Sequence, residues 1–285
     1  SLIAFSILLG CELQSDKKEP LNILWLVAED LSPFYLNAYG DQRAATPNLD
    51  RLAREGVVYT NSFSVSGVCS PSRATLATGL YPNSFGAHNM RTLFQQPAAR
   101  EKGIIDYQAV PPAEVKMVSE IMRENGYYTT NNAKEDYQFF KSELAWDESS
   151  IYAHWRNRPN KETPFFSIFN FGVTHESSMW NFKKNLFDDN EFPPNRKIKK
   201  WWAKYEKSHV PLLVSNDLQV DVPPYLPQNE IGENAMRRMY TNIIRMDRGV
   251  GIILDQLEED GLLEQTIIVW YSDHGGPLPR QKRLL

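Results

Sequence analysis

The chain has 285 residues, of which 42% are hydrophobic and 23% charged, a composition typical of one large globular domain or two small ones. Its formal net charge of -4 at pH 7 gives no overall attraction for nucleic acid, so an anionic substrate would need a local basic patch. Its two cysteines, Cys11 and Cys69, lack the spacing of a thiolate metal site and exclude a disulfide framework.

Residues 1–20 have the pattern of a partial export signal followed by a linker. The first 11 residues are mostly apolar but too few to span a bilayer, and polar residues follow from Gln14. The run Leu8-Leu9-Gly10-Cys11 is similar to a bacterial lipobox, which predicts a lipid anchor on Cys11. We therefore expect a lipoprotein of the periplasm or cell surface that contacts the membrane only through this anchor.

Four apolar runs of strand length each lead to polar residues that could act in catalysis or in metal binding. The runs cover residues 22–28, 127–130, 164–171 and 267–271, and they lead toward Glu29-Asp30, Lys134, His175 and Asp273-His274. Continuous apolar runs are typical of strands that are buried on both faces of a sheet. The sequence thus predicts strands whose carboxyl ends carry charged and imidazole groups.

Helical patterns alternate with these strands. They cover residues 46–56, 70–79, 113–125 and 234–260. In the second pattern, Ser70 is a candidate N-cap, Pro71 suits the first helical position and Gly79 suits the end. The alternation predicts an α/β fold with a doubly wound, mostly parallel sheet flanked by helices, in which the polar strand ends meet at one edge.

The stretch from Cys69 to Arg73 places a sulfur nucleophile and a guanidinium at the start of a predicted helix. Free backbone N–H groups and the helix dipole favour an anion there, and the fork of Arg73 donors matches a tetrahedral oxyanion. The residues therefore predict transfer of an anionic group. Glu29, Asp30 and Asp273 further imply a divalent cation, because three carboxylates would repel one another without one.

The pattern Cys69-x-Pro-x-Arg73, followed by Thr78-Gly79, resembles the signature of the type I sulfatases of the alkaline phosphatase superfamily. In that family a maturation enzyme converts the cysteine to formylglycine, and its hydrated aldehyde attacks the sulfur of the substrate. The resemblance implies that Cys69 is the precursor of this nucleophile and not a buried structural cysteine. It also implies that residues 21–285 form the sulfatase catalytic domain, incomplete at its C-terminus, where the family has a small subdomain.

The resemblance also implies a role for the polar groups at the strand ends. The implied ligands of Ca²⁺, with Mg²⁺ as the alternative ion, are Glu29, Asp30, Cys69, Asp273 and His274. Arg73 and Lys134 are implied to act in catalysis, and His175 is implied to be the general acid. Asp136 stands where the family has a second histidine, so either Asp136 or His88 is a candidate base. His88, Asp136 and Lys282 are expected to contact the substrate.

The segment from residue 176 to residue 228 is rich in tryptophan and lysine, which is typical of a loop that binds sugar rings and their anionic groups. We expect hydrolysis of sulfate esters or N-sulfates on a sulfated polysaccharide. The runs 131–137 and 174–177 look like those of the heparan N-sulfatase-like branch. Two alternatives stay open: a phosphoesterase or phosphonate hydrolase of the same superfamily, and a lipoprotein that binds glycans without turnover.

Overall fold

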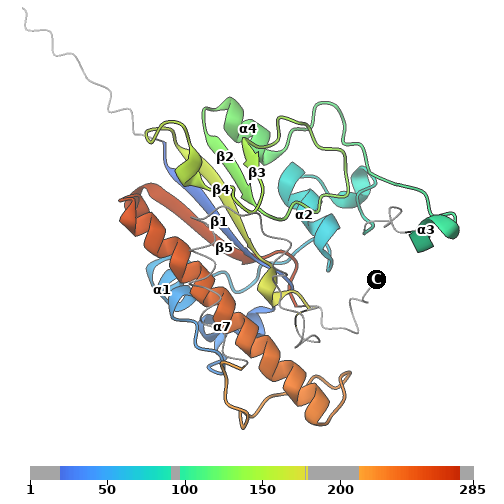
Figure 1. Cartoon of the computed structure of the whole chain (residues 1–285), viewed down its shortest axis with the longest axis vertical. Coiled ribbons are helices and arrows are strands. Elements are labelled where there is room, and N and C mark those ends of the chain that lie inside the picture. Colours follow the sequence, from blue (N-terminus) through green and yellow to red (C-terminus); the bar gives the residue numbers. More distant parts are fainter. Residues whose placement is uncertain (1–19, 91–96, 177, 179–211, 277–285) are drawn as a thin grey trace, which may run out of the picture.

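In the computed structural model, which describes residues 20–90, 97–176, 178 and 212–276, a parallel sheet lies between two layers of helices (Figure 1). The strands are β1 (Asn22–Ala28), β2 (Tyr128–Asn132), β3 (Glu148–Ser149), β4 (Phe165–Phe171) and β5 (Thr266–Ser272). Their order is β3-β2-β4-β1-β5, and every pairing is parallel. The predicted parallel sheet is therefore confirmed.

Helices cover both faces of this sheet. The α-helices are α1 (Pro47–Glu55), α2 (Cys69–Thr78), α3 (Pro97–Glu101), α4 (Val118–Glu124) and α7 (Glu230–Glu259). Short 3-10 turns are η1 (Pro33–Tyr35), η2 (Asn37–Tyr39), η3 (Pro82–Ser84), η4 (Trp155–Asn157), η5 (Gly172–Thr174) and η6 (Leu263–Gln265). Helices α1 and α7 lie on one side of the sheet and α2 and α4 on the other (Figure 1), which confirms the doubly wound arrangement.

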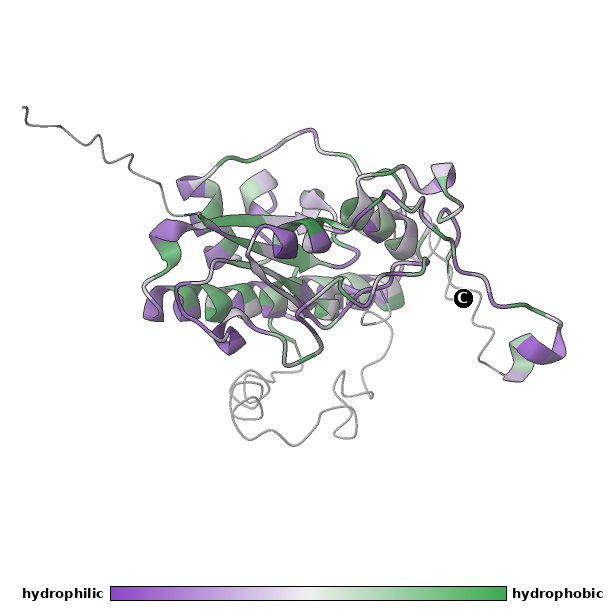
Figure 2. Ribbon diagram, turned by 90° about the horizontal axis from the view of Figure 1, so that it is seen from above, coloured by the Kyte–Doolittle hydropathy of each residue, from purple (hydrophilic) through white to green (hydrophobic). Residues whose placement is uncertain are grey.

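Alternate residues of β1 contribute to two separate cores. Leu24 and Leu26 pack with the residues of α7 on one face, whereas Val27 packs with Ala74 of α2 and Phe166 of β4 on the other face. The hydrophobic strands form the middle layer between helices whose outer residues are polar (Figure 2). Burial on both faces explains why the strands are apolar throughout.

Three predicted helix boundaries differ from the structure. Helix α2 begins at Cys69 with Val68 as N-cap, so the prediction that Ser70 caps it is wrong, although Gly79 does end it with a φ of 72°. Helix α4 is shorter than predicted because residues 113–114 form a turn, closed by the Val115 N–H, which donates to the Pro112 carbonyl at 2.9 Å, and residues 115–117 are not helical. Helix α7 begins earlier than predicted, because Asn229 accepts from the N–H groups of residues 231 and 232.

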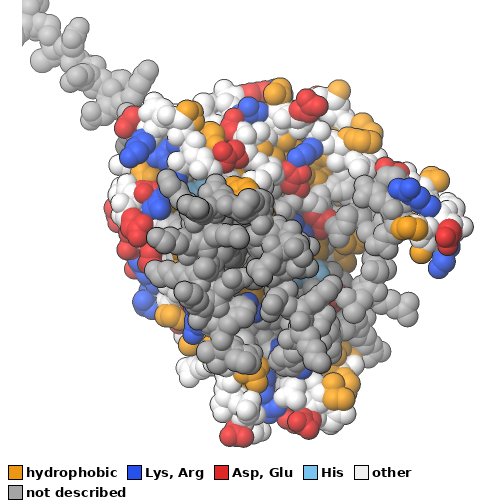
Figure 3. All heavy atoms as spheres, viewed as in Figure 1, with side chains coloured by type: hydrophobic (Ala, Val, Ile, Leu, Met, Phe, Trp, Pro, Cys, Tyr) orange, Lys and Arg blue, Asp and Glu red, His pale blue; other side chains and the backbone are white. Residues whose placement is uncertain are grey.

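Acidic and basic side chains are interspersed on the described part of the face in Figure 3. Within the described ranges, the helices are too short or too polar to traverse a bilayer. Cys11, Lys282 and most of the aromatic and basic segment after residue 178 lie outside the described residues, so the predictions made for them stay predictions.

Candidate active site

The ends of two neighbouring strands bring four of the predicted site residues together. Glu29 and Asp30 follow β1, and Asp273 and His274 follow β5, which pairs directly with β1. The Asp30 N–H donates to Asp273 Oδ1 at 3.2 Å, and all four residues are at most 9% exposed. Parallel pairing therefore places these charged groups at one edge of the sheet, as predicted.

Helix α2 adds Cys69 to the same place. The Cys69 Sγ lies 3.3 Å from His274 Nε2, and the Ser72 hydroxyl donates to the backbone carbonyl of Asp273. Burial would raise the pKa of the Cys69 thiol, but hydrogen bonds with His175 and His274 lower this pKa to about 6. A lowered thiol pKa at the start of a helix is typical of a cysteine in a functional site.

The surroundings of His274 Nε2 fit a cation. This nitrogen carries at most one proton, yet it faces Asp30 Oδ1 at 2.8 Å, Cys69 Sγ at 3.3 Å and Asp273 Oδ1 at 3.4 Å. Asp30, Cys69 and His274 each offer a ligand atom, and these atoms lie within 4.8 Å of one another. A bound cation would satisfy this excess of acceptors, so these three residues and Asp273 are suited to hold a divalent metal.

Glu29 is placed differently from the other predicted metal ligands. Its Oε2 lies 2.9 Å from Lys134 Nζ, and its Oε1 lies 3.6 Å from Arg73 Nη2. Burial opposes ionisation of Glu29, but the charges of Lys134 and Arg73 outweigh it and lower the pKa of the carboxyl. Glu29 is therefore an ionised carboxylate that pairs with both Lys134 and Arg73.

Lys134 and Asp136 lie together in the turn after β2. Asp136 Oδ2 lies 3.5 Å from Lys134 Nζ, and Asp136 Oδ1 accepts a hydrogen bond of 2.8 Å from the Ser70 hydroxyl. This contact explains the wrong N-cap prediction, because the Ser70 side chain is engaged by Asp136 instead of the helix backbone. The structure thus brings Asp136 to Ser70, the residue that follows Cys69, while Lys134 keeps a side chain that is 24% exposed.

His175 follows β4 and η5 and approaches the same centre. Its Nε2 lies 3.7 Å from Asp30 Oδ2, and the imidazole is hydrogen-bonded to Cys69. His88, by contrast, is exposed in the segment after η3, and among the described residues no hydrogen bond or ion pair links it to this cluster. The structure therefore assembles Cys69, Arg73, Lys134, Asp136 and His175, but it does not add His88.

Arg73 is held by groups from several strand ends. Its Nη1 donates to Asn170 Oδ1 at 2.6 Å, and its Nε and Nη2 both lie 3.2 Å from Asp273 Oδ2. The guanidinium is buried and positions the carboxylates of Asp273 and Glu29, which are its neighbours. The sequence analysis missed Asn170, for which the available signal was a polar side chain inside an apolar strand.

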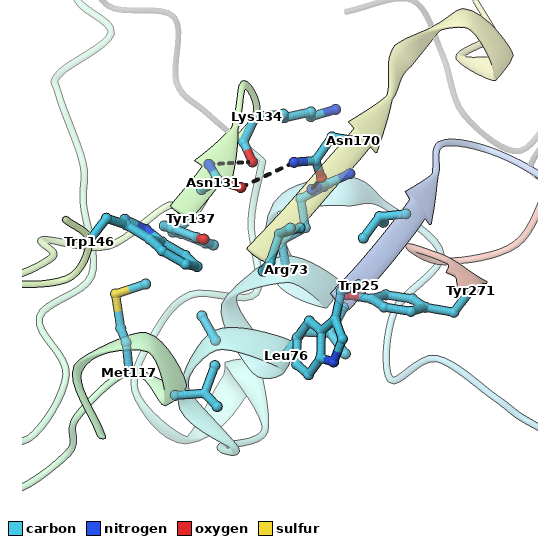
Figure 4. A pocket seen from close by; sticks show the side chains of 14 residues that line it. Trp25, Arg73, Leu76, Met117, Asn131, Lys134, Tyr137, Trp146, Asn170 and Tyr271 are labelled. Carbon is cyan, nitrogen blue, oxygen red and sulfur yellow. Dashed lines mark hydrogen bonds between the residues drawn. The ribbon is translucent and has the colours of Figure 1, made fainter. Parts of the chain in front are cut away.

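A small hollow lies beneath Arg73 and Lys134 on the α2 side of the sheet (Figure 4). Aromatic residues line much of it, among them Trp25, Tyr137, Trp146 and Tyr271. Its volume of about 20 Å³ leaves room for about one water molecule. Arg73 and Lys134 both line it, so the hollow borders the site.

Comparison with known proteins defines the class. The sulfatase family model matches residues 21–284, so the chain belongs to the sulfatase family. An ulvan-active sulfatase of Formosa agariphila is 48% identical over 279 residues, which cover 93% of this chain and 45% of that protein. N-sulphoglucosamine sulphohydrolase of Homo sapiens is 28% identical over 92% of this chain and 52% of that protein. The predicted family is confirmed, and the likeness to the heparan N-sulfatase-like branch is distant.

Solved structures support the fold of the chain but not its substrate or its reaction. The phosphonate monoester hydrolase of Agrobacterium radiobacter aligns with 90% of this chain and 62% of its own, with a TM-score of 0.55 and 17% identity. Sulfate and phosphonate chemistry thus occur on similar folds, so the fold alone does not decide between them. The chain spans about half the length of the curated relatives it matches.

Proposed function

We propose that the protein hydrolyses sulfate esters on a sulfated polysaccharide of the ulvan type, with formylglycine formed from Cys69 as the nucleophile. The observation that carries this proposal is the position of Cys69 at the start of α2, in contact with His274 and beside Asp30, where acceptors for a cation converge. The substrate class follows from the 48% identical relative, which is named for its action on ulvan.

Ca²⁺, with Mg²⁺ as the alternative, would be held by Asp30, Cys69, Asp273 and His274. When bound, the metal would supply positive charge that stabilises the sulfate oxygens, and formylglycine would supply a hydroxyl nucleophile. Lys134 is the partly exposed cation of the cluster, so it is placed to bind a sulfate oxygen while Glu29 fixes its Nζ. Arg73 acts one layer below, because its donors are engaged by Asp273 and Asn170.

His175 is our candidate for the general acid. Its imidazole lies between Asp30 and the sulfur of Cys69, and its side chain is 28% exposed, so a leaving oxygen can reach it. A histidine in this position can give a proton to the sugar oxygen when the S–O bond breaks. Asp136 holds the Ser70 hydroxyl next to the nucleophile and is the candidate base for the return of the site to its resting state.

Maturation and location are parts of the same proposal. A formylglycine-generating enzyme would act on Cys69 before the fold closes, since Cys69 is only 1% exposed in the folded chain. The lipobox-like run predicts that Cys11 anchors the protein in the periplasm or at the cell surface, where it would meet sulfated polysaccharide. Direct acyl labelling of Cys11 in cells, with a Cys11→Ser control, tests the anchor.

Sulfate release by the full-length protein tests the activity. The protein is co-expressed with a formylglycine-generating enzyme, and free sulfate is measured by ion chromatography after incubation with ulvan or heparan sulfate. In a parallel incubation with a phosphonate monoester, the released alcohol is measured. We expect release from ulvan that disappears in Cys69→Ala and in protein made without the maturation enzyme. Turnover of the phosphonate monoester alone would favour the phosphonate hydrolase, and binding of ulvan without release would favour a glycan-binding lipoprotein.

A further inference from the structure

Two asparagines connect the two cations of the site through their side-chain amides. Asn131 in β2 is 1% exposed, and Asn170 in β4 is half-buried. Asn170 accepts from Arg73 Nη1 at 2.6 Å and donates to Asn131 Oδ1 at 3.1 Å. Asn131 in turn donates to the backbone carbonyl of Lys134 at 3.2 Å (Figure 4). An unbroken path of hydrogen bonds therefore runs from Arg73 to Lys134.

Arg73 sets the direction of this path. A guanidinium has only donors, so it requires the oxygen of the Asn170 amide, and the Asn170 NH₂ must then point the other way. That NH₂ donates to Asn131 Oδ1 and, at 2.9 Å, to the carbonyl of Asn132. The Asn131 NH₂ is consequently left for the Lys134 carbonyl and for the Ser149 hydroxyl, both at 3.2 Å. No other orientation of the two amides satisfies these partners.

Both ends of this path flank one carboxylate. Arg73 Nη2 lies 3.6 Å from Glu29 Oε1, and Lys134 Nζ lies 2.9 Å from Glu29 Oε2. Arginine and lysine have long side chains with much rotational freedom, and fixing them costs entropy. The amides hold the Arg73 head group and the Lys134 backbone before a ligand arrives, so this cost is met on folding and not on binding.

We propose that Asn131 and Asn170 are positioning residues for the sulfate site: Asn131 holds the backbone of Lys134, which binds the sulfate, and Asn170 holds Arg73, which supports the carboxylates of Glu29 and Asp273 beneath it. The inference rests on the proposed function for the identity of the anion. Neither amide needs to touch the substrate, because Asn170 acts through Arg73 and Asn131 acts through the backbone of Lys134. A leucine at position 170 has a similar size and offers neither the acceptor nor the donors.

Binding of inorganic sulfate tests this inference without turnover. Calorimetric titration of the full-length, calcium-loaded protein gives a dissociation constant for the wild type and for Asn170→Leu. We expect the constant to rise about 10-fold in the variant, the lower end of the effect of losing a hydrogen bond to a charged group. Asn131→Leu combined with Asn170→Leu is expected to add less than about twofold, because the two amides act in series.

Asn132→Leu is the matched control. Asn132 is in the same strand, but its NH₂ donates to the carbonyls of Ile151 and Ala153, away from the cations. Its replacement is expected to lower the melting temperature and to leave the sulfate dissociation constant within about twofold of the wild type. A merely structural role of Asn170 predicts instead that the two leucine variants behave alike, and this result would overturn the inference.

A milder variant tests the inference if Asn170→Leu does not fold. Asn131→Ser leaves the contact between Asn170 and Arg73 intact but is too short to reach the Lys134 carbonyl. We expect the sulfate dissociation constant of Asn131→Ser to rise about threefold, and an unchanged constant would contradict the inference. A wild-type protein that does not bind sulfate would also contradict it. Wild-type protein that binds sulfate but releases none from polysaccharide would defeat the proposed function alone.

Discussion

Asp247 of α7 holds the start of α1, and its removal should destabilise the domain measurably. Its Oδ1 accepts from the Leu49 N–H at 2.9 Å, and its Oδ2 accepts from the Asn48 N–H at 3.3 Å and from Asn48 Nδ2 at 2.8 Å. Pro47 has no N–H, and the Thr46 hydroxyl donates to Asp50 and not to the helix backbone. Asp247 therefore does what an N-cap side chain usually does.

The structure gives the size of the effect. Asp247 is 1% exposed, so Asp247→Ala leaves the N–H groups of Asn48 and Leu49 buried without an acceptor. Each orphaned donor costs about 1–3 kcal/mol, and removal of the buried carboxylate returns part of its desolvation cost. We expect a loss of about 3 kcal/mol in the free energy of unfolding. Asp247→Asn keeps one acceptor and should lose about 1–2 kcal/mol.

The effect of pH has a definite sign. Burial raises the pKa of Asp247 above 3.8, although hydrogen bonds from Leu49 and Asn48 oppose this shift. The folded state then binds the proton more tightly than the unfolded state, so stability falls as the pH rises from 3.8 through the folded-state pKa. The advantage of the wild type over Asp247→Asn should therefore shrink from acidic to neutral pH.

Urea unfolding followed by tryptophan fluorescence measures both effects. Asp50→Ala on the same helix is the control, because among the described residues the Asp50 carboxylate accepts from the Asn37 amide and the Thr46 hydroxyl and from no helix N–H. The account of Asp247 fails if Asp247→Ala lies within about 0.5 kcal/mol of the wild type at neutral pH, the range of an ordinary surface exchange.

Two further predictions concern the site, and a third concerns His154, which is hydrogen-bonded to Gln256 of α7. Chelation by EDTA should lower both turnover and melting temperature, with Ca²⁺ restoring them, whereas an unchanged melting temperature would argue against a metal at Asp30 and His274. Lys134→Met should lower kcat/KM for ulvan at least about 100-fold, and a loss below about threefold would remove Lys134 from sulfate binding. Burial lowers the pKa of His154 to about 4, although its hydrogen bond with Gln256 opposes this, so stability should fall as the pH drops from 6.5 toward 4. The His154→Gln variant should lose this dependence in urea unfolding, and an unchanged pH profile would contradict the assignment.

The sheet was predictable because its strands are buried on both faces and therefore appear as continuous apolar runs. The polar residues that follow these strands indicated that the strands end at the same edge of the sheet, and β1 and β5 do end side by side at that edge. Strand β3 was missed because two residues, Glu148 and Ser149, carry no hydrophobic pattern. The pairing of β1 with β5 itself joins residues far apart in sequence, for which local patterns hold no information.

The details of the site depend on tertiary partners that local patterns do not reveal. Ser70 has the residue type of an N-cap, but Asp136 takes its hydroxyl. Glu29 was grouped with the metal ligands by its position after β1, which stays a prediction; its contacts with Lys134 and Arg73 were not predictable from that position. In each case a long-range charge or hydrogen bond determines where the side chain points, and only the fold brings these partners together.

The chemical state of residue 69 tests the central claim most directly. Full-length protein is co-expressed with a formylglycine-generating enzyme, and the peptide that carries residue 69 is analysed by mass spectrometry. A Cys69 aldehyde, trapped by a hydrazide reagent and absent from Cys69→Ala, is the result we predict. Unmodified thiol at position 69 in protein that still releases sulfate from ulvan would contradict the account, because the nucleophile would then have to be another group.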